Sequence, residues 1–465
     1  MGATMTATVG NNKTTLIFSA GALALAVFAF LLSGPTVTPD AFLDQGEEFF
    51  PDFKDPNSAT TLEVIEYNEE TGEAKPFKVT NQDGIWTIPS HHNHPADGKE
   101  RLAKTAAGVM GIIKDDFRTD NVSDHEQCGV IDPLDETALS LTGRGKRVTL
   151  KGPGGAILAD FIVGGDVPGH PSFRFVRRPD EKRVYAVRID IDISTKFVDW
   201  IDDDLLVVDK DRIGQVILHD YSVDERSGSL NVRDRVKLGL NDTTWSADNM
   251  PKGYIVDSGK MRNLLTALDE LKIVGVRPKP EGITAALKQA DSTRRMSTAD
   301  LLSLQNKGFF FTRTGELKSN EGELELATDD ALRYTLRFGE VVYGAGEDVS
   351  AGTEASDDKS SGTGANRYLF LSCKVANENF PEPAKPANRE FENKTDSLLT
   401  DADRKNRELD NLHLVWESTI IRARELADEL NSRYAKWYYV ISSASFEKLD
   451  LKRSDLVVAK ADDKS

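Results

Sequence analysis

The sequence predicts an α+β protein, with one N-terminal transmembrane helix followed by two related mixed α/β modules with largely antiparallel sheets and a long C-terminal helical segment. Three observations support this expectation: an uncharged run at 14–34, a pattern of two strands, a loop and a helix that occurs twice, and a charged stretch at 389–434 with apolar residues at helical spacing. With 465 residues, the chain can hold two or three domains, each with its own core.

The uncharged run, "TTLIFSAGALALAVFAFLLSG" at 14–34, has 21 residues. A helix of that length measures about 31 Å and matches a hydrocarbon core of about 30 Å. A cleaved signal peptide is the alternative interpretation. Lys13 precedes the run and several acids follow it, which predicts a cytoplasmic tail at 1–13 and an extracytoplasmic body anchored in the inner membrane.

Small side chains recur along this run at steps of three and four residues, which predicts a helix face that packs against another membrane helix. The expected partner is a permease or auxiliary subunit, or a second copy of the chain. The residues of this face are Ser19, Ala22, Ala26, Ala29 and Ser33.

The repeat is clearest in two segments that align without a gap, "FKVTNQDGIW", which ends at Trp86, and "VKLGLNDTTW", which ends at Trp245. They lie 159 positions apart (245 minus 86). Each follows an alternating strand and precedes an aspartate, Asp97 or Asp257, that is placed as the N-cap of a helix. We expect both tryptophans to be core residues that hold a hairpin against its helix.

Between the two repeats, several segments alternate in polarity and are separated by glycine and proline, which is typical of an antiparallel sheet with one solvated face. These strand segments are 138–143, 147–152, 156–165, 172–178 and 183–188. The predicted organisation is a tail at 1–13, a transmembrane helix at 14–34, a tether at 35–60, a first module at 61–212, a second module at 213–380 with a flexible insertion at 345–366, and a helical segment with a closing strand at 381–465.

The charge and cysteine content exclude several classes of protein. A net charge of −18 argues against binding to nucleic acid and to an anionic membrane surface, because both require clustered lysine and arginine. Cys128 and Cys373 form no CxxC pair, and one disulfide between them is left open.

Three of the seven histidines, His91, His92 and His94, lie in "WTIPSHHNHPAD" and suggest a metal site. Zinc requires three or four ligands that converge on one point. In an extended chain His91 and His92 point in opposite directions, and the matching loop of the second repeat has no histidine. The sequence therefore predicts an exposed loop without a metal.

Two further stretches resemble ligand-binding motifs but lack a required residue. In "KGPGGAILADFIVGG", Ile157 stands where a dinucleotide-binding loop needs its third glycine, so a β-turn is predicted. "DWIDDDLLVVDKDR", from Asp199 to Arg212, has six aspartates but lacks calcium-loop spacing, which predicts a solvated acidic edge. No GxSxG, HExxH or Cys–His pairing occurs, and we predict no catalytic residue, cofactor or enzyme activity.

Several of these elements together resemble the bacterial domain-of-unknown-function family 4340. They are the W-x-x-P stretch from Trp86 to Pro89, Asp97 before its helix, and "GVIDPLD" at 129–135. The resemblance covers about residues 61–222 with a weaker continuation to 275, and the rest of the chain resembles long planctomycete members.

The resemblance implies a partner of ABC-type export permeases and gliding-type auxiliary subunits, and it carries over no catalytic residues. We therefore expect a membrane-anchored, extracytoplasmic accessory or structural subunit of an export or cell-envelope complex. The alternative is an extracytoplasmic module that binds a glycan or peptide, and a hydrolase is the third choice. Whether Trp200, Trp416 or Trp437 lines such a ligand site stays open.

Overall fold

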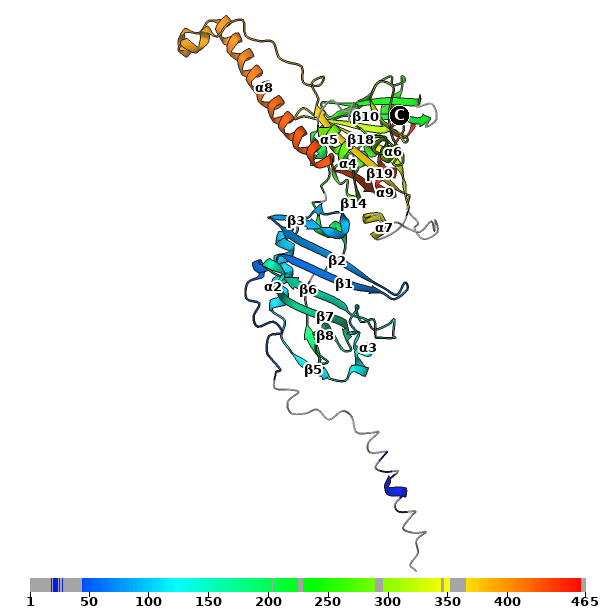
Figure 1. Ribbon diagram of the computed structural model, residues 1–465. Helices are drawn as coiled ribbons and strands as arrows, with labels where there is room; N and C mark the ends of the chain where they lie inside the picture. Colours follow the sequence, from blue (N-terminus) through cyan, green and yellow to red (C-terminus); the bar gives the residue numbers. More distant parts are fainter. Residues whose placement is uncertain are drawn as a thin grey trace, which may run out of the picture. The chain divides into compact units, whose positions relative to one another are not determined.

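The computed structural model describes residues 18, 20–23, 25, 27, 44–191, 193–202, 204–224, 229–288, 296–343, 347–351 and 365–460. These residues form an α+β fold with two large sheets and a long helix near the C-terminus (Figure 1). The chain divides into two compact units, which comprise 1–59, 65–75 and 104–192 in unit 1, and 60–64, 76–103 and 193–465 in unit 2.

The first sheet has nine strands in the order β4-β3-β2-β1-β6-β7-β8-β9-β5. Its strands are β1 (Thr61–Asn68), β2 (Glu73–Gln82), β3 (Ile85–Ile88), β4 (His94–Pro95), β5 (Asp116–Thr119), β6 (Lys146–Lys151), β7 (Ile157–Val167), β8 (His170–Arg177) and β9 (Val184–Arg188). Helices α2 (Lys99–Met110) and α3 (His125–Cys128) accompany them. Neighbours β6 to β9 pair in antiparallel fashion, as their alternating sequences predict.

Unit 1 contains a packed segment that the sequence assigned to a tether. Phe49, Phe50 and Phe53 are buried, and the ring of Phe49 meets Tyr185 edge to face with centroids 5.3 Å apart. The Phe50 ring lies 5.5 Å from that of Phe161 on β7. Residues 49–53 thus complete the core of unit 1, although their sequence shows no strand or helix periodicity.

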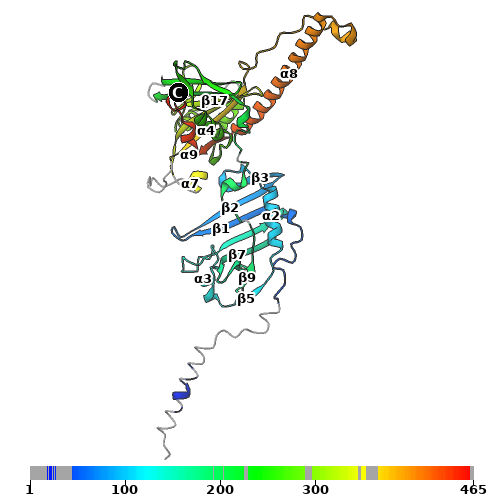
Figure 2. The same cartoon turned by 180° about the vertical axis from the view of Figure 1, so that it is seen from behind.

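Unit 2 is built on an eight-stranded sheet in the order β12-β11-β10-β17-β18-β19-β20-β14, and all seven neighbouring pairs are antiparallel. Figure 2 shows this unit from behind, with strand β17 labelled. Its strands are β10 (Ile213–Asp224), β11 (Ser229–Asn241), β12 (Thr244–Ala247), β14 (Ile273–Pro278), β17 (Glu323–Thr328), β18 (Leu332–Val342), β19 (Asn366–Val375) and β20 (Trp437–Ile441). Two small sheets pair β13 (Tyr254–Val256) with β21 (Val457–Ala459), and β15 (Phe309–Phe311) with β16 (Leu317–Ser319). The shorter helices of this unit are α4 (Ser258–Asp269), α5 (Glu281–Lys288), α6 (Thr298–Gln305), α7 (Glu347–Ser350), α9 (Ser443–Leu449) and α10 (Arg453–Leu456).

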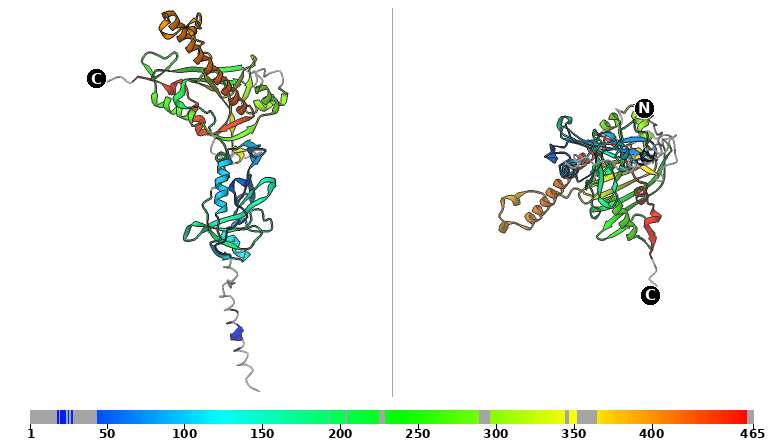
Figure 3. Two further views of the ribbon diagram at one scale, coloured as in Figure 1. Left: turned by 90° about the vertical axis from the view of Figure 1, so that its left-hand side faces the viewer. Right: turned by 90° about the horizontal axis from the view of Figure 1, so that it is seen from below.

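Helix α8 (Asp401–Tyr434), with 34 residues, forms most of the helical segment that the charged sequence at 389–434 predicts. It begins with a capping box between Thr400 and Asp403, which satisfies free N–H groups of its first turn. Its C-terminal half packs on β19, and its N-terminal half extends beyond the sheet together with the preceding segment 381–400 (Figure 3).

The two sequence repeats have the same hairpin register. Thr80 pairs with Thr87 on β2 and β3, and Gly239 pairs with Ser246 on β11 and β12, an offset of 159 at both positions (239 minus 80 and 246 minus 87). Helices α2 and α4 begin and end with the same offset, at 99 and 258 and at 110 and 269.

Asp83 and Asp242 occupy the same turn position of the two repeats, both at φ 54°. A short polar side chain tolerates this left-handed conformation. The repeated unit is therefore a hairpin whose turn and register are set locally.

Some details of the repeat differ from the expectation. Asp257 caps α4 by accepting from the N–H groups of Gly259 and Lys260, as predicted. Asp97 lies two residues before Lys99, the first residue of α2, so Gly98 takes the position next to that helix. Trp86 and Trp245 are half-buried and not core residues: Trp245 lies on the edge strand β12, and Trp86 lies on β3, which only the two-residue strand β4 separates from the edge of its sheet.

The predicted fold class needs one correction. Among the described residues, no helix is long and apolar enough to cross a membrane, so the described fold does not include the transmembrane helix predicted at 14–34. In that segment the described residues are 18, 20–23, 25 and 27. Most of the small-residue face lies outside the described residues, as does most of the insertion at 345–366.

The strand predicted at 138–143 is also absent, because this segment is a loop. The Arg144 guanidinium donates to the carbonyl oxygens of Ser140, Asp132 and Ala138 at 3.2, 3.1 and 2.9 Å. These bonds fold the segment around the Arg144 side chain, which donates the hydrogen bonds that a neighbouring strand would otherwise donate.

We expect Phe49→Ala to destabilise unit 1 by about 3–5 kcal/mol, because truncation of a buried aromatic residue leaves a cavity. The measurement is hydrogen exchange of peptides that cover β9 at increasing urea concentration. Val122→Ala is the matched control: Val122 is 54% exposed, so its truncation is expected to change stability by less than about 0.5 kcal/mol. Equal effects of the two variants would contradict the packed role of residues 49–53.

Candidate functional site

The histidine loop is mostly buried in unit 2, whereas the sequence predicted an exposed loop. The His91 ring stacks on Phe197 with centroids 4.4 Å apart and planes 5° from parallel. His94 meets the edge of Phe197 at 5.4 Å and lies 4.8 Å from the Trp437 ring. Of the three histidines, only His92 is exposed.

Both ring nitrogens of His91 and one of His94 have polar partners within the fold. His91 Nδ1 lies 2.9 Å from Ser90 Oγ, and its Nε2 lies 2.8 Å from Ser350 Oγ. His94 Nδ1 lies 2.8 Å from the Pro95 carbonyl oxygen. Burial lowers the pKa of both histidines to about 4, so both rings are neutral near pH 7. They act as aromatic packing groups with polar edges.

The other stretches named from the sequence are structural as well. Gly154 and Gly155, at φ 70° and 82°, form a tight turn between β6 and β7, in agreement with the predicted turn. In the acidic stretch, Asp202 contacts Arg433 at 3.4 Å, while Leu205 and Leu206 are buried. The stretch is therefore a polar edge interrupted by core residues.

The structure also shows the positions of the tryptophans and cysteines, for which the sequence left a ligand site and a disulfide open. Trp200 and Trp437 are buried, and Trp416 is half-buried with its Nε1 donating to the Phe380 carbonyl oxygen at 3.0 Å. None of the three is an exposed ligand-stacking surface. Cys128 and Cys373 are buried free thiols, and burial raises the pKa of Cys373 to about 12.

A polar cavity lies on one face of the eight-stranded sheet. Residues that stand opposite each other on antiparallel strands project from the same face. One row runs His219–Glu323–Arg337 and the next runs Glu325–Thr335–Ser372 across β10, β17, β18 and β19. The opposite face is apolar and includes Val216, Leu324, Leu326 and Leu336 of the core.

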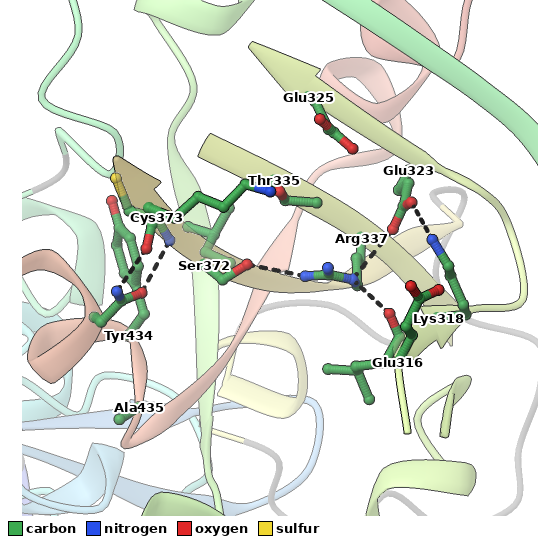
Figure 4. A pocket seen from close by; sticks show the side chains of 14 residues that line it. Glu316, Lys318, Glu323, Glu325, Thr335, Arg337, Ser372, Cys373, Tyr434 and Ala435 are labelled. Atoms are coloured by element: carbon green, nitrogen blue, oxygen red, sulfur yellow. Dashed lines mark hydrogen bonds and ion pairs between the residues drawn. The ribbon is translucent and has the colours of Figure 1, made fainter. Parts of the chain in front are cut away.

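The C-terminal end of α8 and strand β16 enclose part of this polar face and leave a pocket of about 440 Å³ (Figure 4). Its lining residues are Glu316, Leu317, Lys318, Glu323, Glu325, Thr335, Arg337, Leu371, Ser372, Cys373, Lys374, Asn431, Tyr434 and Ala435. Charged and hydrogen-bonding groups dominate this lining, so the pocket suits a polar occupant.

Glu323 is the most buried charge of the pocket, with 2% of its side chain exposed. Its Oε1 accepts from Lys318 Nζ at 2.6 Å, and its Oε2 lies 3.2 Å from Arg337 Nε. Arg337 also donates to the Leu317 carbonyl oxygen at 2.9 Å and to Ser372 Oγ at 3.0 Å, as Figure 4 shows. A buried carboxylate of this kind is tolerated because cationic groups surround it.

Glu325 is held as an anion by its neighbours. His219 Nε2 lies 3.3 Å from its Oε1, and Arg333 donates to its Oε2 at 2.9 Å. The His219 contact and the Arg333 guanidinium lower the pKa of Glu325 to about 2, against the opposing effect of burial. Arg333 has further partners in Gln215, Asn379 and Glu378 at 3.0–3.1 Å.

The end of α8 is fixed beside the pocket by side chains that bind backbone groups. Asn431 accepts from the N–H of Cys373 at 2.9 Å and donates to its carbonyl oxygen at 2.6 Å. Lys279 donates to the carbonyl oxygen of Tyr434 at 2.8 Å and lies 3.8 Å from the centre of the Phe370 ring. Burial holds the pKa of Lys279 well below its usual value.

The sequence analysis did not select the residues of this pocket. A usable signal was present, because Glu323 and Glu325 alternate with leucines in "ELEL", and Arg333, Thr335 and Arg337 alternate in the next strand. Such alternation places each set on one face of a strand. It does not give the pairing of the strands, which brings the two sets together.

Residues 86–290 match the family model described as Domain of unknown function (DUF4340). Over this region the chain is similar to the DUF4340 family. The resemblance expected from the Trp86 to Pro89 stretch is thus confirmed, while the planctomycete and ABC-transport associations stay predictions. No curated protein and no solved structure matches the chain significantly. The DUF4340 match includes His219 and ends before β17, so most of the pocket lies outside it.

The buried histidines predict a pH dependence for the stability of unit 2. Their folded-state pKa of about 4 lies below the unfolded value of 6.5. The contribution of the two neutral histidines to the free energy of unfolding is therefore complete above pH 6.5. It decreases as the pH drops from 6.5 toward 4, by about 3 kcal/mol per histidine. The free energy of unfolding is measured by urea titration across this range, with tryptophan fluorescence as the signal.

His94→Phe keeps an aromatic ring against Phe197 and removes the titrating group, so we expect a smaller loss of stability with acid. His92→Phe at the exposed position is the control and is expected to keep the wild-type pH dependence. An unchanged pH dependence in His94→Phe would contradict the buried neutral state of His94.

Proposed function

We propose that the chain is an accessory subunit of an export or cell-envelope assembly, and that helix α8 forms the surface that binds another protein of that assembly. The observation that carries this proposal is the uncovered apolar surface of α8. Four apolar side chains of the helix are 47–65% exposed, and they are Leu412, Leu414, Val415 and Ile421. Leu412 and Val415, three residues apart, share one side of the helix, and Leu414 and Ile421, seven residues apart, share another. Exposed apolar side chains on an extended element favour a protein–protein contact.

The contacts of α8 within unit 2 leave this surface free. One stripe of the helix, which includes Ile420, Ala423, Ala427 and Leu430, is buried along its length. The N-terminal half is held by polar contacts to the preceding segment, such as Lys394 with Asp403 at 2.8 Å and Arg389 with Asp410 at 2.6 Å. A groove on a partner can therefore receive the remaining helix surface as a preformed helix.

The proposal is tested with the tagged full chain in the cells that produce it. We expect the wild type to migrate on native gels as part of an assembly heavier than the chain. Leu412→Glu with Val415→Glu should shift it to the mass of the isolated chain, because two charges enter an apolar contact. Arg404→Gln with Lys405→Gln changes the net charge by the same −2 on exposed positions of α8 and should leave the assembly intact.

Two outcomes would contradict the proposal. One is a wild-type chain that migrates only at its own mass. The other is an assembly that survives the Leu412 and Val415 substitutions, which would assign the contact to another surface or to self-association elsewhere.

A location of the body outside the cytoplasm is part of the same proposal. Lys13 followed by the uncharged run at 14–34 is typical of export signals, and a cleaved signal peptide gives this location as well. Alkaline phosphatase fused after Ser465 is therefore expected to be active in cells. An inactive fusion, together with an active cytoplasmic reporter at the same position, would reverse the assignment.

A second candidate function, binding of a small polar ligand such as a peptide or glycan, is favoured by the 440 Å³ pocket. Arg337, Ser372 and Asn431 offer donors there, and Glu316 and Thr335 offer acceptors. Most of these groups already bind within the fold, so a ligand must replace existing hydrogen bonds. The helix surface, which has no partner to replace among the described residues, supports the accessory role better.

A further inference from the structure

We propose that His219, Glu323 and Glu325 bind a divalent transition-metal ion at the edge of the pocket, a site independent of the α8 surface. His219 lies on β10 directly opposite Glu323 on β17, and Glu325 follows two residues later on the same face. One ligand atom from each residue lies within 4.8 Å of the other two. Three ligands from two adjacent strands therefore converge on one point.

Two of the three atoms that face this point lack hydrogen-bond partners among the described residues. Among the described residues, His219 Nε2 and Glu323 Oε2 are buried without a hydrogen bond, and Glu323 has only 2% of its side chain exposed. The 3.2 Å contact of Glu323 Oε2 with Arg337 Nε is an ion pair whose direction does not suit a hydrogen bond. Buried polar atoms in this state destabilise the fold, and a bound ion removes this cost.

The neighbouring cations leave one oxygen of each carboxylate for the ion. Glu325 directs Oε2 to Arg333 and Oε1 to His219. Glu323 directs Oε1 to Lys318. The three atoms left for a metal are thus Glu325 Oε1, Glu323 Oε2 and His219 Nε2.

The cationic side chains do not depend on the carboxylates alone. Arg337 keeps bonds to Leu317 and Ser372, and Arg333 keeps bonds to Gln215 and Asn379, when a metal approaches. Their charges still repel a cation, so we expect weaker binding than at a cysteine-rich structural zinc site.

The ligand set indicates the kind of ion. One imidazole with two carboxylates suits zinc, manganese or iron(II), whereas calcium and magnesium prefer oxygen ligands alone. Glu323 and Glu325 also line the 440 Å³ pocket, so solvent and small molecules reach the ion from that side.

The test uses the full chain purified without a histidine tag, freed of metal by a chelator and titrated with Zn²⁺ and Mn²⁺ by calorimetry. We expect one equivalent of ion per chain for the wild type. His219→Ala and Glu325→Gln should each weaken binding at least tenfold. His413→Ala removes another half-buried histidine of the same unit, on α8, and should bind as the wild type does.

A variant that is expected to bind the ion more tightly distinguishes the loss of a metal ligand from misfolding. Lys318→Gln removes the cation that holds Glu323 Oε1 beside the site, so we expect tighter binding than in the wild type. The circular dichroism spectrum checks the fold of each variant.

The proposal is overturned if the wild type binds no ion. It is equally overturned if a folded His219→Ala or Glu325→Gln binds as the wild type does, or if Lys318→Gln fails to strengthen binding. A stoichiometric ion lost in a His91 and His92 double alanine variant and kept in His219→Ala would place the site on the histidine loop.

Discussion

The buried carboxylate of Glu323 constrains the architecture around the polar face of the eight-stranded sheet. A charge that is 2% exposed is stable only when cationic groups compensate for its lost hydration. The register of β17 and β18 brings Arg337 directly opposite, and β16 brings Lys318. Because Arg337 also binds the carbonyl oxygen of Leu317, the position of β16 and the pairing of the two strands depend on the same ion cluster.

The end of α8 is fixed to this face, and its other half gains rigidity from local contacts. An isolated helix in water is marginally stable, even at considerable length. In this chain the capping box at Thr400 and the contact of Lys394 with Asp403 stabilise the first turn. A helix that is already ordered loses little conformational entropy on binding, which favours a partner contact.

The parts of the fold that the sequence predicted are those set by local chemistry. The repeat at 159 positions, the two hairpins and the helix after Asp257 depend on turn and cap residues within a few positions of each other. The long C-terminal helix likewise follows from its own spacing of apolar residues. These features require no knowledge of distant contacts.

The parts that the sequence missed depend on distant contacts. His91 and His94 are buried because Phe197 and Trp437, more than 100 and 340 positions away, cover them. The pocket requires the pairing of β10 with β17 across about 100 residues, which alternation alone does not specify. The loop at 138–143 alternates in polarity like a strand, but its carbonyl groups accept hydrogen bonds from the Arg144 side chain and not from a neighbouring strand.

The side chain of Asn431 has a consequence for how this protein behaves in a crowded cell. Strand β20 pairs with β19 only at 367–369, so the edge of β19 beyond that point has backbone groups directed away from the sheet. The Asn431 amide occupies both groups of Cys373, as the backbone of a further strand would. An open edge of this kind invites strand addition from other chains and hence aggregation. Helix α8 therefore protects this open edge of β19 from strand addition. The same helix that offers a surface to a partner thus keeps the sheet from self-association.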